Sequence, residues 1–239
     1  MTIRPNSSVV PGGPTSVEIL RGPLVDAASK LGVPLTETQI ELLLRFIALL
    51  GRWNATYNLT SVRAPAAMLS QHVVDCLAVI QPLQRWASNA ASARRLLDVG
   101  SGGGLPGVVV AVVCPELEVV CVDAVGKKVA FVRQVAAELA LRNLAAEHGR
   151  VEALNNGRFD VVTSRAFASL SDFVAATRQQ LTDGGVWMAM KGRSPQAEIT
   201  ALPPDIVVFH VEQLQVPGLD VERCLVWMVP KRGEPPCSE

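Results

Sequence analysis

A glycine-rich stretch near the middle of the chain limits the folds that this sequence can adopt. Residues 95–107 read RLLDVGSGGGLPG. The apolar run at Leu96, Leu97 and Val99 predicts a buried strand, and the glycines after it predict a turn at which a ligand lies against bare backbone. Pro106 suits the first turn of a helix, which would aim free N–H groups at that ligand.

Strands and helices alternate after residue 94. We expect strands at 95–99, 118–123, 144–148, 159–164 and 186–191, and a closing antiparallel pair at 206–215 and 224–230. Helices are expected at 106–113, 127–141 and 170–181, with a short one after Pro195. This alternation predicts an α/β fold with a parallel sheet and helices on both faces.

The residues before the glycine stretch have a helical pattern. Thr36 or Thr38 can cap a helix that runs to Trp53, and a further helix is expected at 64–83. Residues 1–15 are rich in Pro, Gly and Ser, which is typical of a loose tail. We therefore expect a tail at 1–15, a helical extension at 16–93, the main domain at 94–232 and a C-terminal tail at 233–239.

The composition narrows the class of protein. Hydrophobic residues make up 49% of 239 residues, and the formal net charge is zero, which argues against a broad nucleic-acid coat but allows a local basic patch. No apolar run approaches the ~18 residues of a membrane span, and no secretory signal is evident. Five scattered cysteines without a C-x-x-C pair indicate reduced thiols in a cytoplasmic protein. The three histidines are far apart in sequence, so no metal site is expected.

Two cofactors compete for the glycine turn. Gly102 to Gly107 match the G-x-G-x-x-G pattern of NAD-binding proteins, and Asp123 falls where a ribose-binding acid is expected. Asp98, however, makes the pattern Asp-x-Gly-x-Gly-x-Gly, which is typical of S-adenosylmethionine-dependent methyltransferases. A carboxylate near the turn suits an ammonium and a sulfonium but opposes a pyrophosphate. We therefore favour S-adenosylmethionine, although Asp98 can also cap the turn and Asp123 can cap the next helix.

Several separated motifs resemble those of one family. They are Trp53-Asn54 with Tyr57-Asn58-Leu59-Thr60, His72-Val73-Val74-Asp75, Asp98 through Gly107, Arg150-Val151-Glu152, Ser164 through Ala168, Met190-Lys191-Gly192, and Leu214 through Pro217 with Glu222-Arg223. From about Thr36 to Val229 the chain resembles the RsmG family, also called GidB. The resemblance implies a class I S-adenosylmethionine-dependent methyltransferase, Rossmann-like with a mainly parallel seven-stranded sheet and an N-terminal helical extension. It also implies methylation of guanine N7 in small-subunit (16S) ribosomal RNA.

The resemblance and the motif together give the expected site residues. Gly100 and Leu105 would contact the cofactor from the turn, with Asp98, Gly102, Gly104 and Asp123 around them, and Val151 and Glu152 would meet the adenine. Arg165 would lie at the methyl-transfer face, and Arg150, Lys191 and Arg223 would bind RNA. Guanine N7 attacks with a lone pair and has no proton to lose, so alignment is needed and no general base is expected.

Some interpretations stay open at this point. His72 and Asp75 can share a helix face, where a helix-packing hydrogen bond is favoured over a place in an active-site wall or an RNA contact. Trp53 is favoured as a contact between the helical extension and the main domain over a base-stacking residue. The alternative functions are an NAD-dependent oxidoreductase and a non-catalytic RNA-binding or assembly module. For the predicted methyltransferase we expect a monomer.

Overall fold

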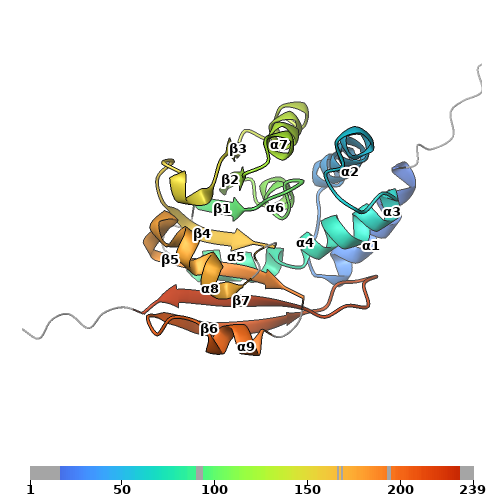
Figure 1. The fold of residues 1–239 in the computed structure, drawn as a ribbon. Coiled ribbons are helices and arrows are strands. Elements are labelled where there is room, and N and C mark those ends of the chain that lie inside the picture. The colour runs from blue at the N-terminus through green and yellow to red at the C-terminus, as the bar shows by residue number, and fades with distance from the viewer. Residues whose placement is uncertain (1–16, 90–93, 166, 168, 193–194, 232–239) are drawn as a thin grey trace, which may run out of the picture.

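A seven-stranded sheet forms the centre of the protein (Figure 1). The computed structural model describes residues 17–89, 94–165, 167, 169–192 and 195–231, so both expected tails lie outside it. The strands are β1 (Arg95–Val99), β2 (Glu118–Asp123), β3 (Leu144–His148), β4 (Phe159–Ser164), β5 (Leu181–Lys191), β6 (Ile206–Leu214) and β7 (Arg223–Pro230). Their order is β3-β2-β1-β4-β5-β7-β6. The pairs from β3 to β5 are parallel and those with β7 are antiparallel, as the alternation and the resemblance predict.

Helices cover both faces of the sheet. They are α1 (Arg21–Lys30), α2 (Glu37–Tyr57), α3 (Pro65–Met68), α4 (Asp75–Leu77), α5 (Ile80–Asn89), α6 (Gly107–Val113), α7 (Gly126–Glu138), α8 (Leu170–Thr177) and α9 (Gln196–Thr200). One core cluster joins α2, α6 and α7 to the sheet, and the other joins α8 to the opposite face. Successive residues of β1 point to opposite faces of the sheet, so Leu96 belongs to the first cluster and Leu97 to the second. A strand buried on both faces is mainly apolar, and the run of Leu96, Leu97 and Val99 makes β1 recognisable in the sequence.

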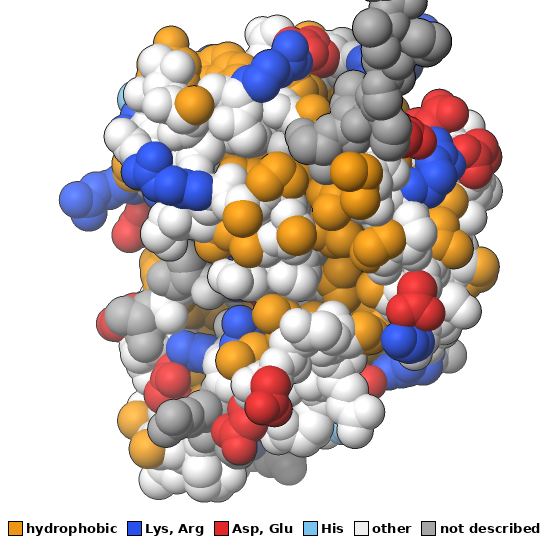
Figure 2. Space-filling model, turned by 90° about the vertical axis from the view of Figure 1, so that its right-hand side faces the viewer, with side chains coloured by type: hydrophobic (Ala, Val, Ile, Leu, Met, Phe, Trp, Pro, Cys, Tyr) orange, Lys and Arg blue, Asp and Glu red, His pale blue; other side chains and the backbone are white. Residues whose placement is uncertain are grey.

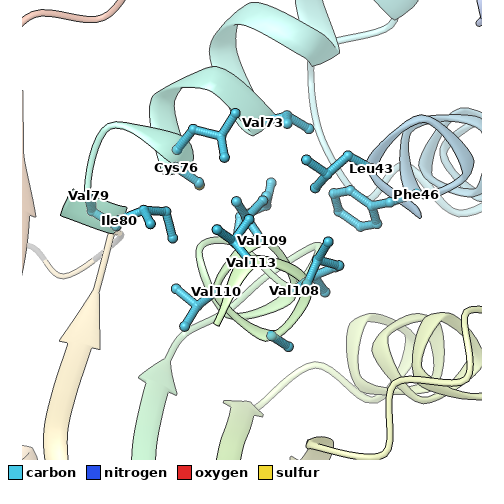
Figure 3. Close-up of a cluster of buried hydrophobic side chains, with 14 of the residues drawn as sticks. Leu43, Phe46, Val73, Cys76, Val79, Ile80, Val108, Val109, Val110 and Val113 are labelled. Atoms are coloured by element: carbon cyan, nitrogen blue, oxygen red, sulfur yellow. The ribbon is translucent and has the colours of Figure 1, made fainter. Parts of the chain in front are cut away.

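The helical extension shares a core with the sheet domain. Figure 3 shows α6 at the centre of this cluster, where Val109 and Val113 face side chains from α2 and from the helices around Val73 and Ile80. All seven residues of α6 are buried. A helix that is apolar on every side must be enclosed, so the extension is needed to cover α6.

Trp53 confirms the favoured interpretation of its role. Its ring lies 5.5 Å from the ring of Phe131 on α7 and 5.0 Å from that of Tyr57, centroid to centroid. Trp53 is partly buried in this contact between the helical extension and the main domain.

Several boundaries differ from the sequence predictions. Thr36 and Gln39 form a capping box at the start of α2, and the helix ends at Tyr57 rather than Trp53. The predicted helix at 170–181 stops at Thr177 and is followed by a 3-10 turn, because Leu181 already pairs with Phe159 as the first residue of β5. Helix α7 ends at Glu138 instead of near Leu141.

The predicted helix at 64–83 is interrupted and longer than expected. A π-helical turn, Leu69–Val74, separates α3 from α4, and α5 continues to Asn89. The sequence expectation that nothing approaches a membrane span was wrong for Pro65–Ser88, which is long and apolar enough to cross a membrane by length and composition. However, 72% of its most apolar window is buried inside the protein, which identifies it as a core helix.

Candidate functional site

The sheet topology brings the predicted site residues to one edge. The parallel strands β2, β1, β4 and β5 end side by side at Asp123, Val99, Ser164 and Lys191, and the Ser164 hydroxyl donates a hydrogen bond of 2.8 Å to the Val99 carbonyl. The antiparallel β7 begins at Arg223 on the same edge. The chain continues from β1 to β2 and from β4 to β5, in opposite directions along the sheet. Open α/β sheets bind ligands at such a switch point between two neighbouring strands. The corresponding side of the molecule faces the viewer in Figure 2, where hydrophobic side chains gather near the centre with Lys and Arg at several points around them.

Two glycines leave open space at the turn after β1. Gly100 and Gly102 have φ angles of +66° and +58°, which favour glycine, and a Cβ at either position would meet no atom within 4 Å. Their N–H groups donate to the Val122 carbonyl and to the Asp123 carboxylate. The turn is therefore fixed to β2 while one side of its backbone stays open, as the sequence predicts for a ligand-binding turn.

The other glycines of the stretch serve packing. A Cβ on Gly107 would lie 2.4 Å from the sulfur of Cys121 and 2.9 Å from Oδ2 of Asp98, and one on Gly104 would lie 2.5 Å from Val108. Gly104 and Leu105 are buried. The missing Cβ of Gly107 lets α6 approach β1 and β2 closely, and that of Gly104 leaves room for Val108 on α6.

Asp98 fixes the start of α6. Its Oδ2 accepts a 2.8 Å hydrogen bond from the N–H of Gly107. The expectation that the start of this helix presents free N–H groups to a ligand is thus wrong at Gly107, and also at Val108, whose N–H donates to the Gly104 carbonyl. The capping role that the sequence left open for Asp98 is the one that Oδ2 performs.

The second oxygen of Asp98 is unusual. Asp98 has no exposed surface, and among the described residues no group hydrogen-bonds to its Oδ1. Burial raises the pKa of Asp98 to about 7, against a lowering by the Gly107 N–H and by the charge of Arg165. A buried carboxylate with one unsatisfied oxygen favours a nearby cationic or hydrogen-bond-donating group.

This raised pKa gives a testable dependence of stability on pH. Between about pH 4 and about pH 7 the folded state holds the Asp98 proton and the unfolded state does not, so the free energy of unfolding decreases as the pH rises and levels off above about pH 7. We expect the wild type to lose roughly 3–5 kcal/mol more than Asp98→Asn across this window. Urea unfolding of both proteins at a series of pH values measures it, and parallel profiles would contradict the assignment.

Asp123 holds the glycine turn and does not cap the next helix. Its Oδ2 accepts from Gly102 at 2.9 Å and its Oδ1 accepts from the N–H of Val125 at 2.8 Å, while Nζ of Lys128 lies 3.9 Å from Oδ2. The N-cap of α7 is Val125, and no side chain caps it. Asp123 is 7% exposed, at the end of β2 where the sequence placed a ribose-binding acid.

The predicted adenine-binding residues follow β3 at the same edge. Val151 and Glu152 lie in a 3-10 turn, Val151–Ala153. Val151 is buried, and its carbonyl accepts from the side chain of Gln180. Glu152 and the preceding Arg150 are exposed. The Gly149 N–H donates to the Asp123 carbonyl, which connects this turn to the end of β2.

A cleft of about 400 Å³ lies beside the ends of β4, β5 and β7. It holds three of the predicted basic or methyl-transfer residues, Arg165, Lys191 and Arg223, but not Arg150. The full lining is Thr60, Ser61, Val62, Gln71, His72, Asp75, Arg165, Met190, Lys191, Gly192 and Arg223. The helical extension thus supplies one wall of the cleft and the sheet supplies the other.

Asp75 joins these two walls. Its Oδ1 accepts a 2.8 Å hydrogen bond from Nε of Arg223, and its Oδ2 lies 3.3 Å from Nη1 of Arg165. Asp75 is 2% exposed. Arg165 also donates to the Gln71 carbonyl at 3.2 Å. The favoured interpretation, a helix-packing hydrogen bond, was thus wrong for Asp75, which lies in the wall of the cleft as the alternative had it. Its two arginine partners were not predicted.

His72 pairs with a hydroxyl instead. Its Nε2 lies 2.9 Å from Oγ1 of Thr60 and its Nδ1 lies 3.0 Å from the Gln71 carbonyl. Burial, and then the charge of Arg165, lower the pKa of His72, which favours the neutral imidazole. Thr60 Oγ1 also accepts from the N–H of Val62, so this hydroxyl stabilises the turn after α2.

The charge of Lys191 is balanced by a carboxylate on a neighbouring helix. Its Nζ lies 2.7 Å from Oε2 of Glu198 on α9, and it also donates to the Phe167 carbonyl. Among the described residues, no group of three or more His, Cys, Asp and Glu side chains could hold a metal ion. The four cysteines within the described ranges are free and buried.

The sheet order, the open glycine turn and the adjacent cleft define a class I methyltransferase fold with an N-terminal helical extension. Solved structures agree on the fold: TrmN from Thermus thermophilus matches 69% of this chain and 53% of its own with a TM-score of 0.50 at 21% identity. A ribosomal protein L11 methylase from Lactobacillus delbrueckii subsp. bulgaricus matches 65% of this chain and 78% of its own, also with a TM-score of 0.50, at 14% identity.

Sequence comparison then identifies the family. The family model GidB, rRNA small subunit methyltransferase G, matches residues 39–226, and this chain belongs to that family. Among the relatives is the ribosomal RNA small subunit methyltransferase G of Leptothrix cholodnii, 59% identical over 88% of this chain and 96% of its own. The protein of that name from Methylibium petroleiphilum is 56% identical over 90% of this chain and 96% of its own. The chain is therefore a methyltransferase, and the comparisons give no support to an NAD-dependent oxidoreductase or a non-catalytic module.

Proposed function

We propose that this protein transfers a methyl group from S-adenosylmethionine to N7 of a guanine in small-subunit (16S) ribosomal RNA, as a monomer in the cytoplasm. The observation that carries the proposal is the position of the open glycine turn next to the basic cleft. The ends of β1 and β4, which begin these two regions, are tied by the Ser164–Val99 hydrogen bond.

The residues at the turn fit the cofactor. Gly100 and Gly102 offer backbone with open space beside it, and Asp98 has a buried oxygen without a hydrogen-bond partner among the described residues. Ionised Asp98 suits the ammonium and sulfonium charges. We assign Asp98, Gly100, Gly102, Gly104, Leu105, Asp123, Val151, Glu152 and Arg165 to the cofactor site. When bound, S-adenosylmethionine supplies a methyl group on an electrophilic sulfonium.

The protein contributes recognition and alignment around this cofactor. The exposed carboxylate of Glu152 can accept from the adenine amine, and backbone beside Val151 can serve a ring nitrogen. Asp123 keeps the turn in shape through Gly102 and presents its carboxylate where the ribose hydroxyls would lie. Gly104 and Leu105 hold the turn against the core.

Arg165 lies between the two halves of the site. Its guanidinium is held by Asp75 on the cleft side, and its charge acts on Asp98 on the turn side. We assign it to orienting the guanine so that the N7 lone pair meets the methyl group in line. A donor on N7 itself would block the reaction, so Arg165 contacts another atom of the acceptor nucleotide. Because N7 has no proton to lose, the Thr60–His72 pair is not needed as a base.

Methyl transfer and cofactor binding test this proposal directly. Purified protein should transfer label from S-adenosylmethionine to small ribosomal subunits, or their naked RNA, taken from a strain that lacks the activity. Calorimetry should detect S-adenosylhomocysteine binding and no NADH binding. Tight NADH binding without S-adenosylhomocysteine binding, or no transfer to either RNA substrate, would overturn it.

A further inference from the structure

The cleft has a net positive charge. Three cationic side chains line it, Arg165, Lys191 and Arg223, and Asp75 is the one carboxylate among its described lining residues. Glu198 compensates Lys191 from outside the lining. The two arginines share the single Asp75 carboxylate, so the arginine pair keeps one net positive charge. An anionic ligand in the cleft would balance this charge.

Asp75 holds both arginines and leaves some of their N–H donors unused. Nε of Arg223 and Nη1 of Arg165 each take a different oxygen of Asp75, which sets the two guanidinium groups next to one another. Within the described part of the chain, Nη2 of both arginines has no protein acceptor. Their side chains are 27% and 28% exposed, so these remaining N–H groups can reach a ligand in the cleft. Planar guanidinium groups bind phosphate through two parallel hydrogen bonds.

We propose that Asp75 is a positioning residue that holds Arg165 and Arg223 as a paired fork for a phosphate of the acceptor RNA, next to the methylated nucleotide. The inference rests on the proposed function and specifies how its acceptor is held. The anionic groups of RNA are its phosphates, so charge balance favours a phosphate over the neutral O6 of the guanine. Asp75 comes from the helical extension and the arginines from β7 and the end of β4, so the extension completes the site.

Removing only the Asp75 charge separates this role from simple folding. Asp75→Asn keeps the shape but leaves the two guanidinium groups to repel each other and lose their alignment. We expect KM for small subunits to rise about tenfold or more, while the affinity for S-adenosylhomocysteine changes less than about twofold. Asp183→Asn is the matched control. Asp183 forms an ion pair of 2.9 Å with Arg158, at the opposite end of the strands from the cleft. This control should keep the wild-type KM.

The salt dependence of RNA binding supplies a second readout. With labelled small-subunit rRNA, the slope of log affinity against log salt should fall by about 0.7 in Asp75→Asn and in Arg223→Gln, as for one lost phosphate contact. The double variant should be no weaker than the worse single variant, because both remove the same fork. An unchanged slope in Arg223→Gln, additive effects, or a normal KM in Asp75→Asn would overturn the proposal. If the variants show the expected changes in slope but the wild-type protein transfers no methyl group, the proposed function fails while the phosphate site stands.

Discussion

Arg165→Ala should lower kcat/KM for methyl transfer to small-subunit RNA by about a hundredfold or more. Arg165 is the one residue that contacts Asp75 on the helical extension, follows β4 and acts by charge on Asp98 at the glycine turn. Its loss removes the group that orients the acceptor between the cofactor turn and the cleft. Single-turnover assays with saturating S-adenosylmethionine measure the effect on chemistry.

A control arginine separates this role from a general loss of positive charge. Arg158→Ala removes an exposed arginine at the opposite edge of the sheet, where it pairs with Asp183, and should keep wild-type turnover. Arg165→Ala should still bind S-adenosylhomocysteine measurably, which checks that the protein is folded. Wild-type turnover by Arg165→Ala would refute the role assigned to Arg165.

Gly100→Asp should lower the affinity for S-adenosylhomocysteine by about a hundredfold or more. A side chain here enters the open space beside the turn, and its carboxylate adds bulk and charge where the cofactor lies. A residue other than glycine at this positive φ costs roughly 1–2 kcal/mol, which a folded domain tolerates. Isothermal titration calorimetry gives the affinity, and circular dichroism confirms the fold.

Gly218→Asp is the matched control for this variant. Gly218 has a φ of +78° and open space around its Cβ position, so the substitution carries the same backbone strain in a turn between β6 and β7. It should leave cofactor affinity unchanged. Equal affinity in Gly100→Asp and Gly218→Asp would remove the glycine turn from the cofactor site.

Local sequence patterns predicted most of the sheet domain. The bounds of β1, β2, β3 and β4 agree with the sequence predictions. For β1, β2 and β4 the reason is a short, mainly apolar run between clear breaks. The start of β5 was missed because Leu181 extends the apolar pattern of the preceding helix, and only its pairing with Phe159 shows that it is in the sheet. The π-helical turn around His72 depends on a shift in backbone hydrogen bonding that side-chain patterns do not express.

Some features of the site were predictable from the sequence and others were not. The open turn at Gly100 and Gly102 was predictable, since consecutive glycines after a buried strand have few other uses. The packing role of Gly107 was not, because it depends on how closely Cys121 of β2 approaches. Asp75 was noticed as a motif residue but its partners lie 90 and 148 residues away in the chain, so only the tertiary structure reveals the arginine pair.

Methylation of guanine N7 leaves a modified nucleotide whose position in the RNA can be measured. N7-methylguanosine can be mapped in small-subunit rRNA from cells with and without this protein, by chemical cleavage at the modified base and by mass spectrometry. One N7-methylguanosine should disappear when the protein is removed and return with the wild type but not with Arg165→Ala. An identical N7-methylguanosine pattern in both RNAs would contradict it.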